Sequence, residues 1–328
     1  MKRSSLVLIV ILLIVMFAAC TPAAPSKTAL VTLMLDWVPN TNHTGFFVAQ
    51  EKGYFQQAGL NVSIVQPGEV YAEQAVASGA ADFGVSFQEQ VTLARATNPP
   101  APLVSIAAII QHNTSGFASL ADKGVDSAKG FEGLTYASFG SPFEEPTLRV
   151  LMGCAGGDFS KLKIANTGTT DPLALMASKQ VDLVWIFYGW QGFQAKQQGI
   201  NLNVVMLADH TDCIPDYYTP ILITSEKMIR DKPEVVRAFL KAVSQGYQDA
   251  IQNPDETAKI LVKAAPELDA ALVQASQAWL SPRYQADASR WGEQKPEVWE
   301  SYSQWMASNG IIDKPIDAGA AFTNDFLP

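Results

Sequence analysis

Short apolar segments alternate with segments of helical spacing along most of the chain, and this alternation limits the possible folds more than any other feature. Runs of strand length stand at 30–35, 61–66, 81–85 and 103–110. Segments with helical spacing lie between them, at 44–57, 72–78 and 87–96. Such alternation is typical of a mostly parallel sheet with helices on both faces. The sequence therefore predicts an α/β fold.

The same unit repeats after a polar, glycine-rich segment at 113–133. Strand-like and helix-like runs then alternate at 134–137, 141–155, 162–165, 172–178, 181–186, 190–198 and 203–206. Residues 220–224 are predicted to return to the first sheet, and the chain from 232 onward is predicted to be helical. We therefore expect two α/β lobes and a helical C-terminal tail. Lobe 1 would comprise 29–112 and 216–328, lobe 2 would comprise 113–215, and the hinges would lie near 112–118 and 208–216.

The N-terminus has the pattern of a secretory signal. Lys2 and Arg3 precede an apolar run over 6–19, which is shorter than the ~20 residues that cross a bilayer. The Ala18-Ala19-Cys20 sequence resembles a bacterial lipoprotein signal. We expect a lipoprotein signal peptide at 1–19, lipidation on Cys20 and a flexible tether at 20–28. The alternative is an ordinary secretory signal with an incidental cysteine.

Composition excludes some classes of function. With 23 basic and 32 acidic residues the net charge is -9, which argues against a nucleic-acid partner. Three cysteines are too few for a disulfide scaffold. Cys154 and Cys213 remain after the signal is removed, and they are equally compatible with a disulfide and with two buried small side chains.

Catalytic patterns are scarce. None of the three histidines has a second ligand at metal-binding spacing, and neither a nucleophile elbow nor a phosphate loop is present. The sequence therefore proposes no catalytic residue, no metal site and no cofactor.

Ligand-binding features are better represented. The loop 36–45 follows a buried strand, where ligands bind in α/β sheets. We expect Trp37 and Asn40 in this loop to contact a flat ligand, because an indole at a loop needs a partner to pack on. The alternative is that Trp37 fills the core of its own lobe and Asn40 only shapes the turn.

A second candidate loop is Ser141-Pro142-Phe143-Glu144, which follows a strand and opens a helix. Ser141 with Glu144 three residues later predicts a capping box, and Pro142 suits the first helical position. The free N–H groups at such a helix start can also hold an acceptor atom of a ligand. A cap alone and a cap with a ligand contact remain equally compatible with the pattern.

A third candidate is the aromatic cluster at 185–193. Strand parity assigns Trp185 and Phe187 to the core, whereas Tyr188, Trp190 and Phe193 are predicted to face a cleft. Phe87 and Glu89 open another helix after a strand and are weaker candidates for the same role.

Several motifs together resemble one known family. They lie at 35–45, 49–55, 79–85, 140–144, 187–192 and 232–240. The segments are similar to the family that joins bacterial thiamine-pyrimidine-precursor binding proteins with fungal pyrimidine synthases, and that also reaches riboflavin binders. The resemblance implies a type II periplasmic-binding-protein fold whose two lobes close on a ligand like a flytrap.

Within that family, the predicted export signal and the lack of a cysteine cluster favour a binding protein over a synthase. The resemblance then implies a monomeric, lipid-anchored protein on the extracytoplasmic side of the membrane. It would deliver a small molecule to an ABC permease and its ATPase.

The ligand is harder to predict. The resemblance implies that pyrimidine binders use a carboxylate near the Tyr-Gly-Trp turn to bind the amino group. Phe193 and Gln194 follow that turn here, and neither is acidic. An aromatic mouth that includes Phe139, with amides at Asn40, Gln191 and Gln194, therefore favours riboflavin narrowly. Formylaminopyrimidine or hydroxymethylpyrimidine is the alternative. A carboxylate in the cleft would favour that alternative, and the candidates are Asp182, Glu89, Glu144 and Glu145.

Overall fold

The computed structural model describes residues 28–168 and 170–328. The predicted signal peptide at 1–19, Cys20 and all of the predicted tether except residue 28 lie outside the described residues. Within the described ranges, no helix combines the length and the apolar character that crossing a bilayer would require.

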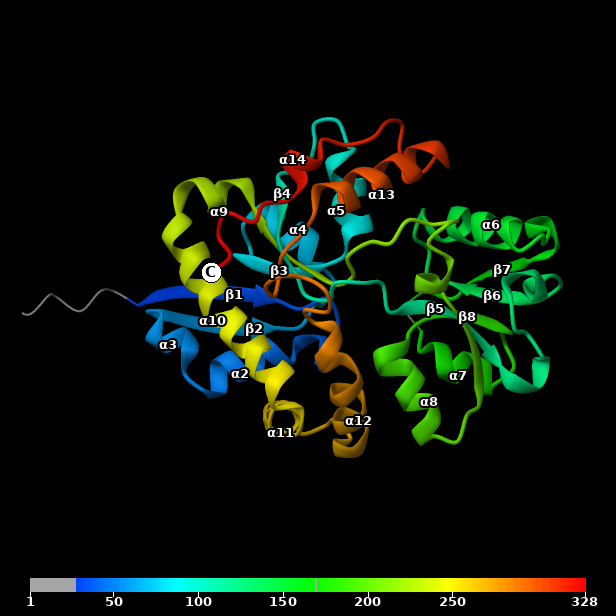
Figure 1. Cartoon of the computed structure of the whole chain (residues 1–328), viewed down its shortest axis with the longest axis horizontal. Coiled ribbons are helices and arrows are strands. Elements are labelled where there is room, and N and C mark those ends of the chain that lie inside the picture. The colour runs from blue at the N-terminus through cyan, green and yellow to red at the C-terminus, as the bar shows by residue number, and fades with distance from the viewer. Residues whose placement is uncertain (1–27, 169) are drawn as a thin grey trace, which may run out of the picture.

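Two five-stranded sheets form two lobes with the same plan (Figure 1). Lobe 1 holds β1 (Ala29–Met34), β2 (Leu60–Val65), β3 (Phe83–Ser86), β4 (Leu103–Ala108) and β10 (Ile221–Ser225) in the order β2-β1-β3-β10-β4. Lobe 2 holds β5 (Ser115–Leu120), β6 (Thr135–Ser138), β7 (Lys163–Asn166), β8 (Leu183–Phe187) and β9 (Leu202–Met206) in the order β7-β6-β8-β5-β9. In each sheet the fourth strand, β10 or β5, runs antiparallel to both neighbours. The predicted two-lobed α/β fold is confirmed.

Helices cover both sheets. Those of lobe 1 are α2 (Thr44–Glu51), α3 (Tyr54–Gln57), α4 (Ala72–Ser78), α5 (Gln88–Arg95), α9 (Glu226–Asp231), α10 (Pro233–Gln252), α11 (Pro254–Ala264), α12 (Ala270–Leu280) and α14 (Ala318–Ala321). Those of lobe 2 are α6 (Glu144–Cys154), α7 (Pro172–Ala177) and α8 (Phe193–Gln197). The last long helix, α13 (Pro296–Ser308), packs on both lobes, because Trp299 joins a lobe 1 core whereas Tyr302 and Trp305 join the core of lobe 2.

The long helix α10 anchors lobe 1. Phe239 stacks on Phe83 of β3 with ring centroids 3.9 Å apart. A Cβ on Gly246 would lie 2.0 Å from the carbonyl oxygen of Gly45 in α2, so only glycine allows the two backbones to approach this closely. This contact places the start of α2, and with it the loop that follows β1, on a rigid support.

Two local predictions were wrong. The predicted single helix at 44–57 divides into α2 and α3, because Gly53 adopts a left-handed φ of 74° between them. The segment 113–133 contains β5, which hydrophobic periodicity missed because Ser, Gly and Ala make up four of its six residues. A Cβ on Gly116 would lie 2.5 Å from the carbonyl oxygen of Val205, so the neighbouring strand β9 requires glycine here.

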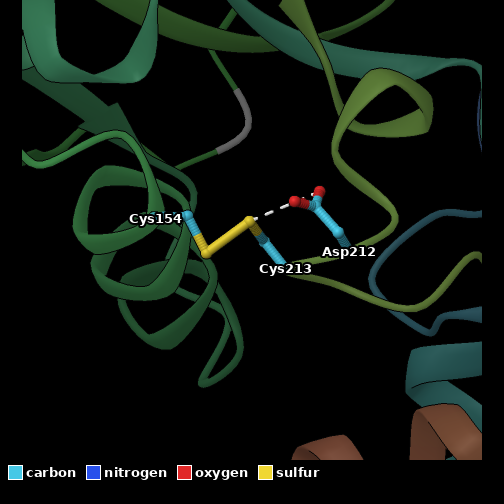
Figure 2. The surroundings of a disulfide bond; sticks show 3 residues. All are labelled: Cys154, Asp212 and Cys213. Carbon is cyan, nitrogen blue, oxygen red and sulfur yellow. Dashed lines mark hydrogen bonds between the residues drawn. A yellow bond between two sulfur atoms is a disulfide. The ribbon is translucent and has the colours of Figure 1, made fainter.

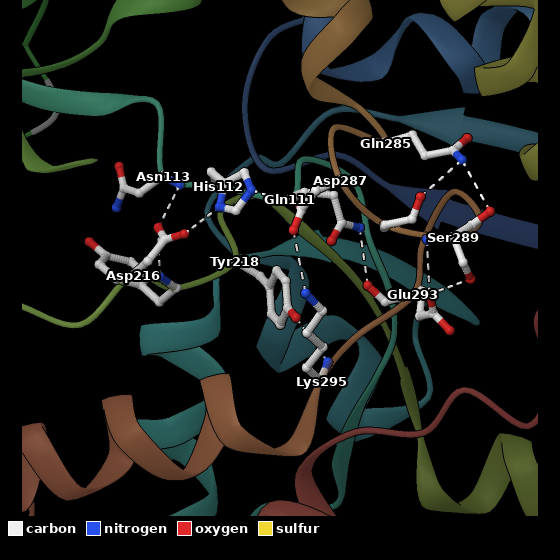
Figure 3. Close-up of polar contacts among 12 residues, drawn as sticks. Gln111, His112, Asn113, Asp216, Tyr218, Gln285, Asp287, Ser289, Glu293 and Lys295 are labelled. Atoms are coloured by element: carbon white, nitrogen blue, oxygen red, sulfur yellow. Dashed lines mark hydrogen bonds and ion pairs between the residues drawn. The ribbon is translucent and has the colours of Figure 1, made fainter. Parts of the chain in front are cut away.

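The chain crosses between the lobes twice, and one polar cluster joins the two crossings (Figure 3). His112 on the first crossing donates from Nδ1 to Asp216 on the second at 2.5 Å, and from Nε2 to Asp287 at 2.9 Å. Asp216 also accepts the backbone N–H of Asn113 at 3.0 Å. The hydrogen bond to Asp216 is the main reason why the pKa of His112 is raised to about 9. A protonated His112 therefore ties both crossings to the tail of lobe 1.

A disulfide joins Cys154 and Cys213, which the sequence had left undecided (Figure 2). Cys154 is the last residue of α6, and Cys213 lies after the short helix η7 (Leu207–His210) near the second crossing. The Cα atoms are 6.3 Å apart, within the usual range for a disulfide. The bond therefore fixes the end of α6 to the segment that leaves lobe 2.

Candidate functional site

Two adjoining cavities lie between the lobes. The first, the Trp37 cavity, has a volume of about 190 Å³ and is lined by Asp36, Trp37, Asn40, Asn42, Phe87, Phe187, Trp190 and Gln191. The second, the Glu89 cavity, has a volume of about 100 Å³ and is lined by Phe87, Glu89, Gln90, Phe139, Phe143, Trp185 and Phe187. Phe87 of lobe 1 and Phe187 of lobe 2 border both cavities and stack with ring centroids 5.7 Å apart.

The loop after β1 holds Trp37 at the first cavity. The Trp37 side chain is 40% exposed, so it does not fill the core of lobe 1. Asn40 lines the same cavity, but its Oδ1 accepts the backbone N–H of Asn42 at 2.9 Å and its Nδ2 donates to the carbonyl of Val38 at 3.0 Å. Asn40 therefore shapes the loop as well as bordering the cavity.

A buried histidine supports this loop from below. The backbone N–H of Asn40 donates to His43 Nδ1 at 3.2 Å, so the proton of a neutral ring lies on Nε2, which donates to Asp36 Oδ1 at 2.5 Å. Asp36 also lines the cavity. The hydrogen bond from His43 thus orients a carboxylate at the wall of the Trp37 cavity.

The second predicted loop folds differently from the expected capping box. The first residue of α6 is Glu144, so Pro142 is not at the first helical position, and Ser141 makes no side-chain cap. The Glu144 carboxylate instead accepts the N–H of Ser141 at 2.6 Å, the N–H of Phe139 at 3.0 Å and the hydroxyl of Tyr136 at 2.6 Å. One half of the predicted capping box is therefore present, the hydrogen bond from the Ser141 N–H to Glu144, whereas the serine half is absent.

Glu144 is consequently a buried support for its neighbours. Ser141, Pro142 and Glu144 are not among the residues that line the two cavities, whereas Phe139 and Phe143 line the Glu89 cavity. The carboxylate therefore holds the loop in the shape that presents these two phenyl rings to the cleft.

The third predicted cluster is only partly at the cavities. Trp190 and Gln191 line the Trp37 cavity, and both lie in a single π-helical turn, η6 (Tyr188–Gly192). Insertions of this kind are often found at functional sites. Gln191 Oε1 accepts the backbone N–H of Phe187 at 2.9 Å, which leaves the amide nitrogen as the group that it offers to a ligand.

Tyr188 and Phe193 are not among the lining residues. Both rings pack against Trp279 of α12, with centroids 5.3 Å and 6.1 Å away. The Lys196 ammonium also lies over both rings, 5.2 Å from the Tyr188 centroid and 4.9 Å from the Phe193 centroid. This cluster is a contact between lobe 2 and lobe 1 outside the two cavities.

Sequence reasoning also missed several lining residues. Trp185 and Phe187, assigned to the core by strand parity, line the Glu89 cavity. Parity predicts which side chains share a face of a strand, but it does not predict that this face meets the other lobe. Asp36 and Asn42 lay beside predicted residues in the first loop, and their position next to Trp37 was the available signal.

Among the acids considered from the sequence, Glu89 is the one that lines a cavity. It is 4% exposed, and burial raises the pKa of its carboxyl to about 8. Within the described part of the chain, its Oε2 has no hydrogen-bond partner. Asp182 pairs with Lys123 at 2.5 Å, and Glu145 is exposed, so neither takes the same role.

The charge at the cleft is acidic. Among the described residues that line the two cavities there are two carboxyl groups, Asp36 and Glu89, and no lysine, arginine or histidine. The described ranges also contain no cluster of three or more His, Cys, Asp or Glu side chains that is placed to hold a metal ion. The arrangement suits a flat, uncharged or cationic ligand that carries N–H donors.

Comparison with known proteins shows where the chain belongs. The NMT1/THI5-like family matches residues 40–257. The chain is 30% identical to the formylaminopyrimidine-binding protein of Halalkalibacterium halodurans, over 98% of this chain and 99% of the relative. It is 27% identical to the riboflavin-binding protein RibY of Chloroflexus aurantiacus, over 98% and 96% of the two chains.

An enzyme of the same family is more distant. The 4-amino-5-hydroxymethyl-2-methylpyrimidine phosphate synthase of Legionella pneumophila is 25% identical, over 93% of this chain and 95% of the relative. The family thus includes binding proteins and synthases, and the two binding proteins above have the higher identity.

A solved structure has the same fold. The alkanesulfonate-binding protein SsuA of Xanthomonas axonopodis pv. citri, bound to MOPS, superposes with a TM-score of 0.67 and 14% identity, over 92% of this chain and 99% of that chain. This likeness, together with the two lobes and the cavities between them, confirms the predicted fold. The chain belongs to the NMT1/THI5-like family and has a two-lobed α/β fold.

Proposed function

We propose that this protein is the extracytoplasmic binding component of an ABC importer, and that its ligand is a pyrimidine precursor of thiamine such as formylaminopyrimidine. The observation that carries the proposal is the pair of aromatic-lined cavities between the lobes. Aromatic walls with a few polar groups are typical of sites for flat heteroaromatic ligands. The relative with 30% identity is a formylaminopyrimidine-binding protein, which supports the same ligand class.

Cavity size favours a single ring over three fused rings. The cavities, of about 190 and 100 Å³, are smaller than the roughly 300–1,000 Å³ that is usual for drug-sized ligands. The lack of a carboxyl group beside the Tyr188 turn had favoured riboflavin. The cleft nevertheless contains a carboxyl group, that of Glu89, which comes from the other lobe. Both points favour the pyrimidine, which had been the alternative in the sequence-based prediction.

Riboflavin remains a second candidate because of one specific observation. The two cavities adjoin at Phe87 and Phe187, and separation of these two rings would join them into one longer aromatic slot. The RibY relative supports the same possibility. Sulfonates and other anions are disfavoured, because the described residues of the lining offer carboxyl groups and no cation.

The mechanism is capture without turnover. The ligand enters between Trp37 and Trp190, displaces the contact between Phe87 and Phe187, and shifts the lobes toward a closed arrangement that the permease recognises. Cys20 supplies the lipid anchor, and the protein acts as a monomer. No step requires a cofactor or a catalytic residue.

Fluorescence titration tests this function. Formylaminopyrimidine and riboflavin are titrated separately into the purified protein, with tryptophan and flavin emission as the readouts. We expect one-to-one saturation with sub-micromolar affinity for the pyrimidine and at least tenfold weaker binding of riboflavin. The reverse order would establish a riboflavin carrier, and absence of binding for both would reject the proposed ligand class.

A further inference from the structure

The Glu89 cavity contains two buried polar atoms without a partner. Glu89 Oε2 and Trp185 Nε1 each lack a hydrogen-bond partner among the residues that the structure describes, and both side chains line this cavity. A buried polar group without a partner costs free energy, so native proteins rarely retain one without a reason. The described structure holds eight such atoms, and these two, one from each lobe, belong to side chains that line the same small cavity, which points to a ligand that satisfies them.

The two atoms are complementary in chemistry. The indole N–H of Trp185 can only donate, whereas the carboxyl of Glu89 can accept and, when protonated, also donate. Burial raises the pKa of Glu89, so the carboxyl carries a proton at neutral pH in the ligand-free protein. The remaining lining side chains are four phenyl rings and Gln90.

The surroundings of Glu89 offer no internal alternative. Its own backbone N–H and the Glu73 carboxyl of α4 act on the Glu89 carboxyl, and Glu73 has a partner of its own in the Ser86 hydroxyl. Tyr217 and Tyr302 lie near enough to feel the charge of Glu89, but they stack on each other at 4.1 Å and make no hydrogen bond to it in the described structure. Among the described residues that line this cavity there is no cationic side chain.

We propose that Glu89 and Trp185 recognise the polar edge of the ligand, and that this edge has an N–H donor next to an acceptor atom. The amidine edge of a 4-aminopyrimidine has this pattern: its ring nitrogen accepts from the Glu89 carboxyl and its amino group donates to it. A second acceptor on the ligand receives the Trp185 N–H. The proposal rests on the proposed function, and it names the residues that select the ligand within that class.

The imide edge of an isoalloxazine offers a similar pattern, with an N–H between two carbonyl oxygens. The shared chemistry is therefore an N–H beside an acceptor, and the two sources differ in ring number. A ligand without such an edge would leave Glu89 buried and unpaired.

The test compares wild type with Glu89→Leu, Glu89→Gln and Trp185→Phe. The probes are formylaminopyrimidine, riboflavin, 4-amino-2-methylpyrimidine and 2-methylpyrimidine, which lacks the amino group. We expect Glu89→Leu to weaken binding of the amino compounds about 100-fold, since each lost hydrogen bond leaves a ligand group unpaired. Glu89→Gln should stay within about tenfold of wild type, because an amide accepts and donates in the same places.

Trp185→Phe keeps an aromatic ring and removes one donor, so we expect about tenfold weaker binding. The matched control is Glu234→Leu, because Glu234 is also in the first turn of a helix, α10, but is exposed. It should leave affinity and melting temperature unchanged.

A second readout separates ligand recognition from a structural role. Glu89→Leu should raise the melting temperature of the ligand-free protein and lower its affinity for the ligand. Loss of a residue with a structural role would instead lower both the melting temperature and the affinity. Unchanged affinity in Glu89→Leu, with wild type binding normally, would overturn the inference and leave the proposed function intact.

The remaining outcomes are also decisive. If wild type binds only the 4-amino-2-methylpyrimidine fragment, and Glu89→Leu abolishes this, the inference stands and the proposed function fails. If wild type binds none of the four compounds, both fail.

Discussion

Two buried glutamates occupy similar places in the two lobes, and they differ in what surrounds them. Glu89 lies in the first turn of α5 after β3, and Glu144 begins α6 after β6. Glu144 is fully buried and accepts hydrogen bonds from Tyr136, Phe139 and Ser141, whereas Glu89 is 4% exposed with Oε2 unpartnered in the described structure. The comparison teaches that a buried carboxyl with a full set of donors supports a loop, whereas one that keeps an unpartnered oxygen is available to a ligand.

The two helices also differ at their other ends. Helix α6 ends at Cys154, which is bonded to Cys213, and α5 ends at Arg95, which forms an ion pair with the more exposed Glu226. Helix α6 is thus fixed covalently at one end and by a carboxylate at the other. Lobe 2 presents a rigid aromatic wall that includes the unpaired Trp185 indole N–H, whereas the unpaired carboxyl oxygen lies in lobe 1.

Replacement of Glu144 should have the largest effect on stability. Glu144→Ala leaves the hydroxyl of Tyr136 and two backbone N–H groups buried without an acceptor, so we expect a loss of about 4 kcal/mol in the free energy of unfolding. Urea unfolding measures it. A loss below about 1 kcal/mol would mean that water replaces the carboxylate, and the contrast with Glu89 would then disappear.

Removal of the disulfide should come next. The paired variant Cys154→Ser with Cys213→Ser opens a loop of 59 residues, for which we expect a loss of about 3 kcal/mol. Thermal unfolding with and without reductant checks this, because reductant should lower the melting temperature of wild type and leave that of the variant unchanged. Equal responses of the two proteins to reductant would show that the bond does not stabilise the end of α6.

Glu89→Leu should change stability in the opposite direction. Removal of an unsatisfied buried carboxyl should raise the free energy of unfolding of the ligand-free protein by about 2 kcal/mol at neutral pH. Because burial raises the pKa of Glu89 to about 8 from 4.5, the wild-type protein loses stability as pH rises from about 4.5 to about 8. The advantage of the variant should therefore grow across that window. An advantage that shrinks with pH would mean that Glu89 ionises with a partner.

The sequence predicted the fold, and it predicted the loops at the cleft better than the individual side chains. Trp37, Trp190 and Phe143 line the cavities as expected, because aromatic residues at loops after parallel strands have few other places to pack. Tyr188 and Phe193 were misplaced because their partner, Trp279, comes from a helix far along the chain, and no local pattern indicates that contact.

The two glutamates show the limit of sequence reasoning more directly. Each follows a parallel strand and begins a helix, so the sequence alone does not tell which one has donors. The difference depends on Tyr136, whose hydroxyl reaches Glu144, and on a loop backbone that turns two N–H groups toward it. Those contacts exist only once lobe 2 has folded.

Substitution in the cluster that joins the two crossings should have the smallest effect on stability. The same substitution separates the pH dependence that Glu89 causes from the one that His112 causes. The hydrogen bond to Asp216, supported by Asp287, raises the pKa of His112 to about 9 from 6.5. Its stabilising contribution is therefore complete below about pH 6.5 and is lost as pH rises through about 9. We expect His112→Gln to lower the free energy of unfolding by less than about 1 kcal/mol at pH 6, because the side chain is half exposed.

In His112→Gln, the loss of stability between pH 8 and 9 should disappear, while the fall between pH 4.5 and 6.5 should remain. Glu89→Leu should reduce the fall between pH 4.5 and 6.5 and keep the loss between pH 8 and 9. Burial also raises the pKa of the Glu73 carboxyl, so the double variant should keep only the fall above pH 4.5 that Glu73 contributes. Urea unfolding of all four proteins at about pH 4.5, 6.5, 8 and 9 measures both windows. If His112→Gln also removed the fall below pH 6.5, the two groups would be coupled through the crossings, and the unpaired state of Glu89 would depend on the hinge rather than on its cavity alone.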